Sequence, residues 1–128
     1  MLFRKSEEKR ASEAAEQAEI DRLKALRPEA LAAEILPVMG SGAVTQGLRG
    51  ATVQEIIKGM GLKATWTVNT GLLLLPVREA LQRLEHANLV MQMASGVDQA
   101  THWRITSTGE ESLAAGDVAQ RLGVGAAG

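Results

Sequence analysis

The chain contains no cysteine and only two histidines, His86 and His102. Without cysteine, neither a disulfide scaffold nor a cysteine-based zinc site can form, and two histidines are too few for a metal centre built from histidine alone. Tyrosine is also absent, and one phenylalanine and two tryptophans are the only aromatic residues. The core must therefore be aliphatic, and side chains on which nucleic-acid bases could stack are scarce.

The chain also lacks an excess of either charge and a long apolar run. Its 14 lysines and arginines are balanced by 15 aspartates and glutamates, which excludes a polycation that coats nucleic acid through bulk charge. The longest apolar run, Leu72 to Val77, is far shorter than the ~20 residues of a membrane span. Residues 1–8 lack the apolar stretch of a secretory signal. We therefore expect a cytoplasmic protein without membrane contact, associated with the nucleoid if it binds DNA.

Patterns typical of catalytic or nucleotide-binding sites are missing as well. The glycine pairs Gly40-x-Gly42 and Gly59-x-Gly61 are not followed by the Lys-Ser/Thr of a phosphate-binding loop, and neither is set between a strand and a helix of a βαβ unit. No Ser/His/Asp arrangement and no pair of carboxylates stands out. We expect a protein that is not an enzyme and has no cofactor and no metal.

What the chain does have predicts one compact domain with an appendage, because 45% of its 128 residues are apolar. We place a charged helical arm at residues 1–27, the domain at 28–122 and a flexible, glycine-rich tail at 123–128. Residues 4–27 hold seven basic and six acidic residues, with a thin stripe of alanines at positions 11, 14, 15 and 18. This arm is either a solvated helix or a helix that packs against a partner, for example in a dimer.

Two helices are predicted in the first half of the domain. The first covers residues 28–39 and should end or kink at Pro37, since proline cannot donate a backbone hydrogen bond. A glycine-rich loop over residues 40–50, with room for a short strand, follows it. The second helix starts at Thr52, which forms a capping box with Glu55, and stops at Gly61.

The most regular helix of the sequence covers residues 76–88. Pro76 suits the first helical position, and Asn88 suits a left-handed conformation at the end. Apolar residues recur at helical spacing on one side and predict the buried face. This face consists of Val77, Ala80, Leu81, Leu84 and Ala87.

The last part of the chain predicts a hairpin and a further helix. Residues 89–94 and 102–106 read as strands joined by a turn over 95–100, with Trp103 in the core beneath the turn. A capping box that starts at Ser107 opens the last helix. The fold class is therefore mainly α with a small β-hairpin (α+β). The order of helix, short strand, helix, helix, hairpin and helix is that of a winged helix-turn-helix, here with an extra N-terminal helix.

Three segments resemble winged-helix DNA-binding proteins. The segment P-V-R-E-A-L-Q-R-L-E-H-A-N-L-V at 76–90 is similar to the recognition helix of GntR-type regulators, and T-V-Q-E-I-I-K-G-M-G-L at 52–62 resembles the helix before it. The segment H-W-R-I-T-S-T-G-E-E-S-L at 102–113 looks like the closing strand and helix of MarR- or PadR-like regulators. The resemblance covers about residues 28–115 and implies a small transcriptional regulator that binds double-stranded DNA.

This resemblance also implies a set of DNA-contacting residues. The recognition helix would enter the major groove, and the hairpin turn at 95–101, the wing, would lie along the backbone or in the minor groove. Residues 48–104 carry six basic and four acidic side chains, a mild excess in favour of DNA. We expect a homodimer on palindromic half-sites, with the arm in the dimer contact. The expected DNA-binding residues are Lys63, Thr65, Thr67, Arg78, Gln82, Arg83, Ser95, Gly96, Gln99 and Arg104.

Two departures from the family pattern leave a second function open. The turn before the recognition helix is about ten residues longer, and Leu72–Leu75 replace its polar residues. These leucines are either buried or form an apolar patch for another protein. The wing carries Asp98 and no basic residue at its tip, and Arg78 and Arg83 could pair with helix-surface carboxylates instead of phosphates. The alternative is therefore a winged-helix module for protein–protein interaction that uses Leu72–Leu75.

Overall fold

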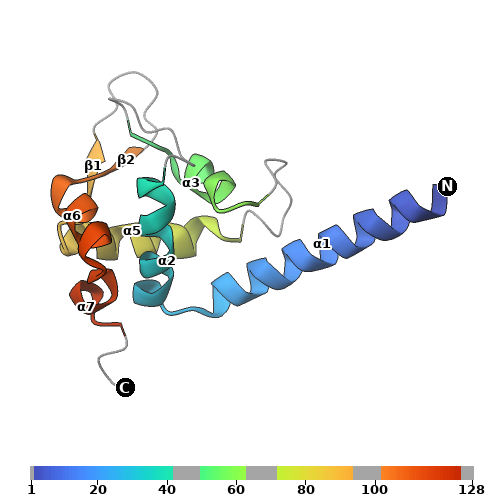
Figure 1. The fold of residues 1–128 in the computed structure, drawn as a ribbon, viewed down its shortest axis with the longest axis horizontal. Helices are drawn as coiled ribbons and strands as arrows, with labels where there is room; N and C mark the ends of the chain where they lie inside the picture. The colour runs from blue at the N-terminus through green and yellow to red at the C-terminus, as the bar shows by residue number, and fades with distance from the viewer. Residues whose placement is uncertain (1, 42–49, 63–71, 94–101, 125–128) are drawn as a thin grey trace.

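The computed structural model describes residues 2–41, 50–62, 72–93 and 102–124. Over these residues the chain is mainly helical with a small two-stranded antiparallel hairpin, which confirms the predicted α+β class (Figure 1). No helix in these ranges is both long enough and apolar enough to cross a membrane. The elements are α1 (Leu2–Ala25), α2 (Pro28–Gly40), α3 (Val53–Gly59), α5 (Leu74–His86), β1 (Val90–Met93), β2 (His102–Ile105), α6 (Ser107–Ala115) and α7 (Val118–Leu122).

The elements from α2 to α7 pack together, and we call them the body. Helix α2 is its central element, because it contacts α3, α5, α6 and α7. The sequence predicted a helix over 28–39 that ends or kinks at Pro37; the helix does not end there but continues to Gly40, with Pro37 exposed. A proline inside a helix costs about 3 kcal/mol. On either side of it, Leu36 and Met39 are buried in the core, and each burial stabilises the fold by about 1.5–3 kcal/mol. Packing therefore outweighs the local preference of proline.

The segment before α3 pairs with the free edge of the hairpin. Strands β1 and β2 pair in the register Val90↔Ile105 to Met93↔His102. On the other side of β2, the amide of Ala51 donates to the carbonyl of Trp103 at 2.7 Å, and the amide of Trp103 donates back at 2.8 Å. Trp103 is buried, as predicted. Among the described residues, this bridge is the one strand pairing outside the hairpin.

The C-terminal end of helix α1 packs against the elements that follow residue 28. Ile20 and Leu23 lie in the same buried cluster as the core residues of α2 and α5. The guanidinium of Arg22 donates from Nη1 and Nη2 to the two carboxylate oxygens of Glu34 on α2, at 2.9 and 2.7 Å. The body therefore includes the last turns of α1, while the rest of α1 projects away from it to the N-terminus (Figure 1).

The C-terminal helices close the body beside α2. Thr106, not Ser107, is the N-cap of α6: its hydroxyl accepts from the amide of Gly109 at 2.9 Å. Helix α7 follows after Gly116 and was not predicted. Asp117 before it accepts hydrogen bonds from the hydroxyl of Ser112 and from Nε of Arg121. Of the predicted tail, residues 123 and 124 are described, and Gly123 caps α7.

Candidate nucleic-acid interface

Helix α5 starts two residues earlier than the sequence predicted. Its first residue is Leu74, and Leu73 occupies the N-cap position without a side-chain cap. Leu73 is fully buried, and its carbonyl accepts from the amide of Val77 at 2.9 Å. Pro76 still lies in the first turn, where backbone N–H groups have no partner within the helix, so it costs no hydrogen bond. Anchoring of Leu73 in the core thus adds two leucines to the helix.

Helix α5 ends at His86, two residues before the predicted end, and the predicted left-handed residue follows it. Asn88 adopts a left-handed conformation with φ of 63°. The amide of Leu89 then donates to the carbonyl of Leu84 at 2.9 Å, which closes the last turn. The hydroxyl of Thr106 donates to the carbonyl of Asn88 at 2.6 Å. Both ends of α5 are therefore held by the body, so the direction of the helix is set.

The two sides of α5 differ sharply in solvent exposure. The inner side packs on α2 and α3 with Val77, Ala80, Leu81 and Leu84, all fully buried. The outer side is exposed along the whole helix and spans about 16 Å at 1.5 Å per residue. We call it the α5 outer face. It consists of Leu75, Arg78, Glu79, Gln82, Arg83 and His86.

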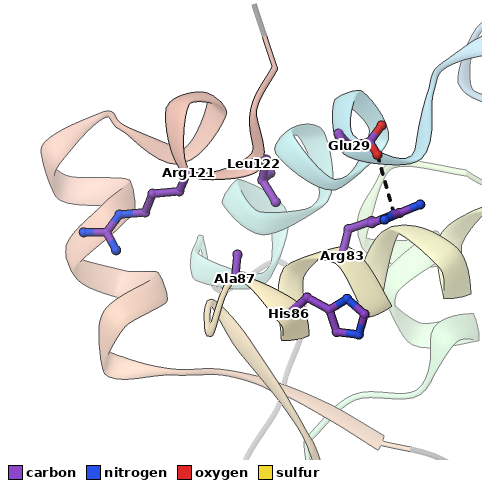
Figure 2. A pocket seen from close by; sticks show the side chains of 6 residues that line it. All are labelled: Glu29, Arg83, His86, Ala87, Arg121 and Leu122. Atoms are coloured by element: carbon purple, nitrogen blue, oxygen red, sulfur yellow. Dashed lines mark ion pairs between the residues drawn. The ribbon is translucent and has the colours of Figure 1, made fainter. Parts of the chain in front are cut away.

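The two arginines of the α5 outer face differ in their surroundings. Arg83 directs its Nε to Oε1 of Glu29 on α2 at 3.5 Å, with 52% of the side chain exposed (Figure 2). Arg78 is exposed and makes no ion pair or hydrogen bond with any residue in the described part of the chain. The carboxylate pairing foreseen from the sequence thus involves Arg83 with Glu29. Arg78 keeps its full hydrogen-bonding capacity for an external acceptor.

A shallow hollow of about 240 Å³ lies where α5 meets α2 and α7. Arg83, His86 and Arg121 line it, but their side chains do not converge (Figure 2). Arg83 turns toward Glu29, and Arg121 points away from the hollow and binds Asp117. The hollow therefore has no focus of positive charge that would hold an anion.

The structure brings three of the ten expected DNA-binding residues together. Arg78, Gln82 and Arg83 share the α5 outer face. Arg104 lies on β2 opposite Met91 and is half-buried. The expected contacts Lys63, Thr65, Thr67, Ser95, Gly96 and Gln99 lie outside the described residues.

The run Leu72–Leu75 divides between core and surface. Leu73 is buried, whereas Leu72, Leu74 and Leu75 are 48%, 38% and 66% exposed. Burial, the first interpretation of this run, therefore holds for Leu73 alone. Met91 is 49% exposed as well, and the sequence analysis did not single it out. Its place beside buried Val90 in a strand was the available signal, because neighbouring strand residues point to opposite faces.

Comparison with known protein families, with curated proteins and with solved structures found no match to the chain. Within the described ranges, no three histidine, aspartate or glutamate side chains come together as ligands of a metal ion. The case for a function therefore rests on the α5 outer face and on the order of the elements around it.

Proposed function

We propose that this chain is a winged-helix protein that binds duplex DNA through the α5 outer face, as a small regulator of transcription acting as a homodimer. The observation that carries the proposal is Arg78, an exposed and unpaired arginine beside Gln82 on a helix whose other side is buried. Arginine and glutamine are side chains that make paired hydrogen bonds to guanine and adenine in the major groove.

The arrangement of elements supports the same proposal. Helices α2, α3 and α5 pack against one another as the three helices of a helix-turn-helix would. Together with the bridge at Ala51 and the β1–β2 hairpin, their order along the chain fits a winged helix. In that architecture the third helix of the body enters the major groove, with the residues of its N-terminal half against the base edges. Arg78, the fifth of the 13 residues of α5, lies in this half, and Gln82, the ninth, lies one turn farther along the same face. Their position fits that of base-contacting residues on a recognition helix.

Fluorescence anisotropy with labelled random-sequence duplex DNA tests this proposal. We expect binding at about 50 mM salt that weakens steeply toward 200 mM, because bound phosphates release counterions. Replacing Arg78 with alanine should weaken binding by about 1–3 kcal/mol if the arginine reads a base, and should lower the salt slope by about one if it contacts a phosphate.

The matched control is Lys24→Ala, which removes one exposed positive charge from α1 instead of α5. It should leave DNA affinity within about twofold of the wild-type value, since a charge outside the α5 outer face acts only through screened attraction. Absence of binding by the wild-type chain at low salt would overturn the proposal. Equal losses in the two variants would show that charge alone, and not the α5 outer face, drives binding.

A second candidate function follows from the exposed leucines at the start of α5. Leu72, Leu74 and Leu75 form an apolar surface next to Arg78, as expected of a site for a protein partner. Leu72→Ser separates the two functions, because Leu72 is 48% exposed, lies outside the α5 outer face, and its replacement should not disturb the core. A variant that keeps DNA binding but loses association with a protein favours the second function. Substitution of Leu73 is uninformative, since this residue belongs to the core.

A further inference from the structure

Residues 7–15 in the projecting part of α1 are not covered by any described part of the body. Residues 7–15 are all exposed, which is nine consecutive positions. A helix turns once in about 3.6 residues, so nine positions sample every direction around its axis. A helix that packed on the body would bury at least one residue in each turn, as α1 does farther on at Ile20 and Leu23. The projecting segment therefore has free surface on all sides.

The nine-residue helical segment 7–15 is short enough to need stabilisation by contacts beyond its own backbone hydrogen bonds. Isolated helices shorter than about 12–15 residues are marginal in water. The described side chains of residues 7–15 make no ion pair with one another that would support the helix locally. Glu19, by contrast, binds Arg22 at 2.6 Å close to the body. The segment is thus well suited to a partner helix.

The charges of α1 are segregated along its length. Residues 4–10 hold four basic and two acidic residues, whereas residues 13–21 hold four acidic residues and no basic one. Between them lie Ala11 and Ser12, followed by Ala14 and Ala15 after Glu13, so most side chains at the middle are small enough for two helices to approach closely. Two parallel copies would place like charges side by side. Two antiparallel copies would place each basic segment against the acidic segment of the other.

We propose that α1 is a dimerisation helix that pairs in antiparallel orientation with the α1 of a second copy of the chain. The two-fold axis passes near Ser12, so that residue 6 of one copy lies near residue 18 of the other. Such a contact uses the same surface on both copies and closes as a dimer. The two bodies lie at opposite ends of the helix pair. This inference concerns assembly and holds whether or not the chain binds DNA.

Sedimentation equilibrium of the full-length chain with charge-reversed variants tests the pairing. Lys9→Glu/Arg10→Glu and Glu13→Lys/Glu16→Lys should each weaken dimerisation at least tenfold at low salt, because each places like charges opposite one another. An equimolar mixture of the two variants should recover the dimer, because both contacts of the mixed pair are complementary. Glu110→Lys/Glu111→Lys, a reversal of the same size at exposed positions of α6, should leave the dimer intact.

The orientation is tested by cysteine cross-linking, since the chain has no cysteine of its own. Under mild oxidation, a mixture of Ser6→Cys and Ala18→Cys chains should form the mixed disulfide faster than either variant alone forms its own. A monomeric wild-type chain at about 100 μM, at which dimers with a micromolar dissociation constant are filled, would overturn the proposal. So would mixtures that fail to recover the dimer, or faster cross-linking of position 6 to itself.

Discussion

At the scale of single residues, Gly109 shows how closely α6 approaches the rest of the fold. It is buried, and a β-carbon at this position would overlap the carbonyl oxygen of Leu89 and lie 2.7 Å from Cγ1 of Ile105. Leu89 follows the left-handed residue that ends α5. The missing side chain therefore lets the backbone of α6 rest directly on the turn that leaves α5, and the position of the candidate DNA-binding helix depends on it.

We expect Gly109→Ala to destabilise the chain by about 3 kcal/mol, the upper end of the cost of overpacking, because a backbone oxygen cannot move aside. Gly40→Ala is the control, since a β-carbon there would overlap only Cδ1 of Leu113, the end of a flexible side chain. Its cost should stay below about 1 kcal/mol, partly offset by the better helix propensity of alanine. Urea unfolding measures both values, and equal costs would contradict the direct backbone contact.

Asp117 provides a pH-dependent contribution to stability. The Ser112 hydroxyl, together with Arg121, holds the pKa of Asp117 below its usual value of 3.8. The unfolded chain therefore binds a proton more readily, and the stabilisation is complete above pH 3.8 and is lost as the pH falls toward the lower pKa of the folded state. The difference in melting temperature between wild type and Asp117→Asn should shrink as the pH falls from about 6 to 3. A constant difference would contradict this role.

At the scale of elements, the junction of α5, β2 and α6 is held by one hydroxyl. Thr106 accepts from the amide of Gly109 and donates to the carbonyl of Asn88, so it caps α6 and ties it to the end of α5. We expect Thr106→Val to cost about 2 kcal/mol, since it removes a cap and leaves a carbonyl without its donor. Ser107→Ala, at the position where the sequence predicted the cap, should change stability by less than about 0.5 kcal/mol.

Chemical unfolding of both variants measures these costs. A larger loss for Ser107→Ala would mean that the capping box operates in solution after all. The comparison also shows where local sequence rules end. Thr106 and Ser107 are both good N-cap residues, and the choice between them depends on Asn88, which lies 18 positions earlier in the chain.

The elements that the sequence predicted correctly are those that depend on neighbouring residues. The capping box of Thr52 and Glu55 is present, with the amide of Thr52 donating to the Glu55 carboxylate at 3.1 Å. Gly61 has φ of 92° directly after Met60, the C-cap of α3. Helical spacing likewise placed Arg78 and Gln82 opposite the buried side of α5.

The elements that the sequence misplaced depend on burial by distant parts of the chain. The start of α5 depends on the burial of Leu73, and the sequence of four equal leucines does not show which one the core takes up. Continuation of α2 through Pro37 depends on Met39 in the same way. For the candidate site, spacing predicted that Arg83 is exposed but could not show that Glu29, 54 positions earlier, pairs with it.

At the scale of the whole molecule, α1 is attached rigidly to the body. Ile20 and Leu23 fix α1 in the core, and Arg22 binds Glu34 of α2. Helix α2 in turn packs on α5. A dimer joined through α1 would therefore hold its two α5 outer faces at a defined distance and not on flexible tethers. This rigidity connects the proposed assembly with the proposed binding of DNA.

We expect the wild-type chain to bind a duplex with two half-sites more tightly than a duplex with one, by at least tenfold, because binding of the first α5 places the second at a high effective concentration. Half-sites one helical turn apart, about 10 base pairs, or a multiple of this spacing should be preferred. Sites selected from a random duplex library and measured by anisotropy give both affinities. The Lys9→Glu/Arg10→Glu variant should keep its affinity for one half-site and lose the gain from the second. If this variant keeps the gain, the two bodies are joined by some other contact; if the wild-type chain shows no gain, each body binds DNA alone.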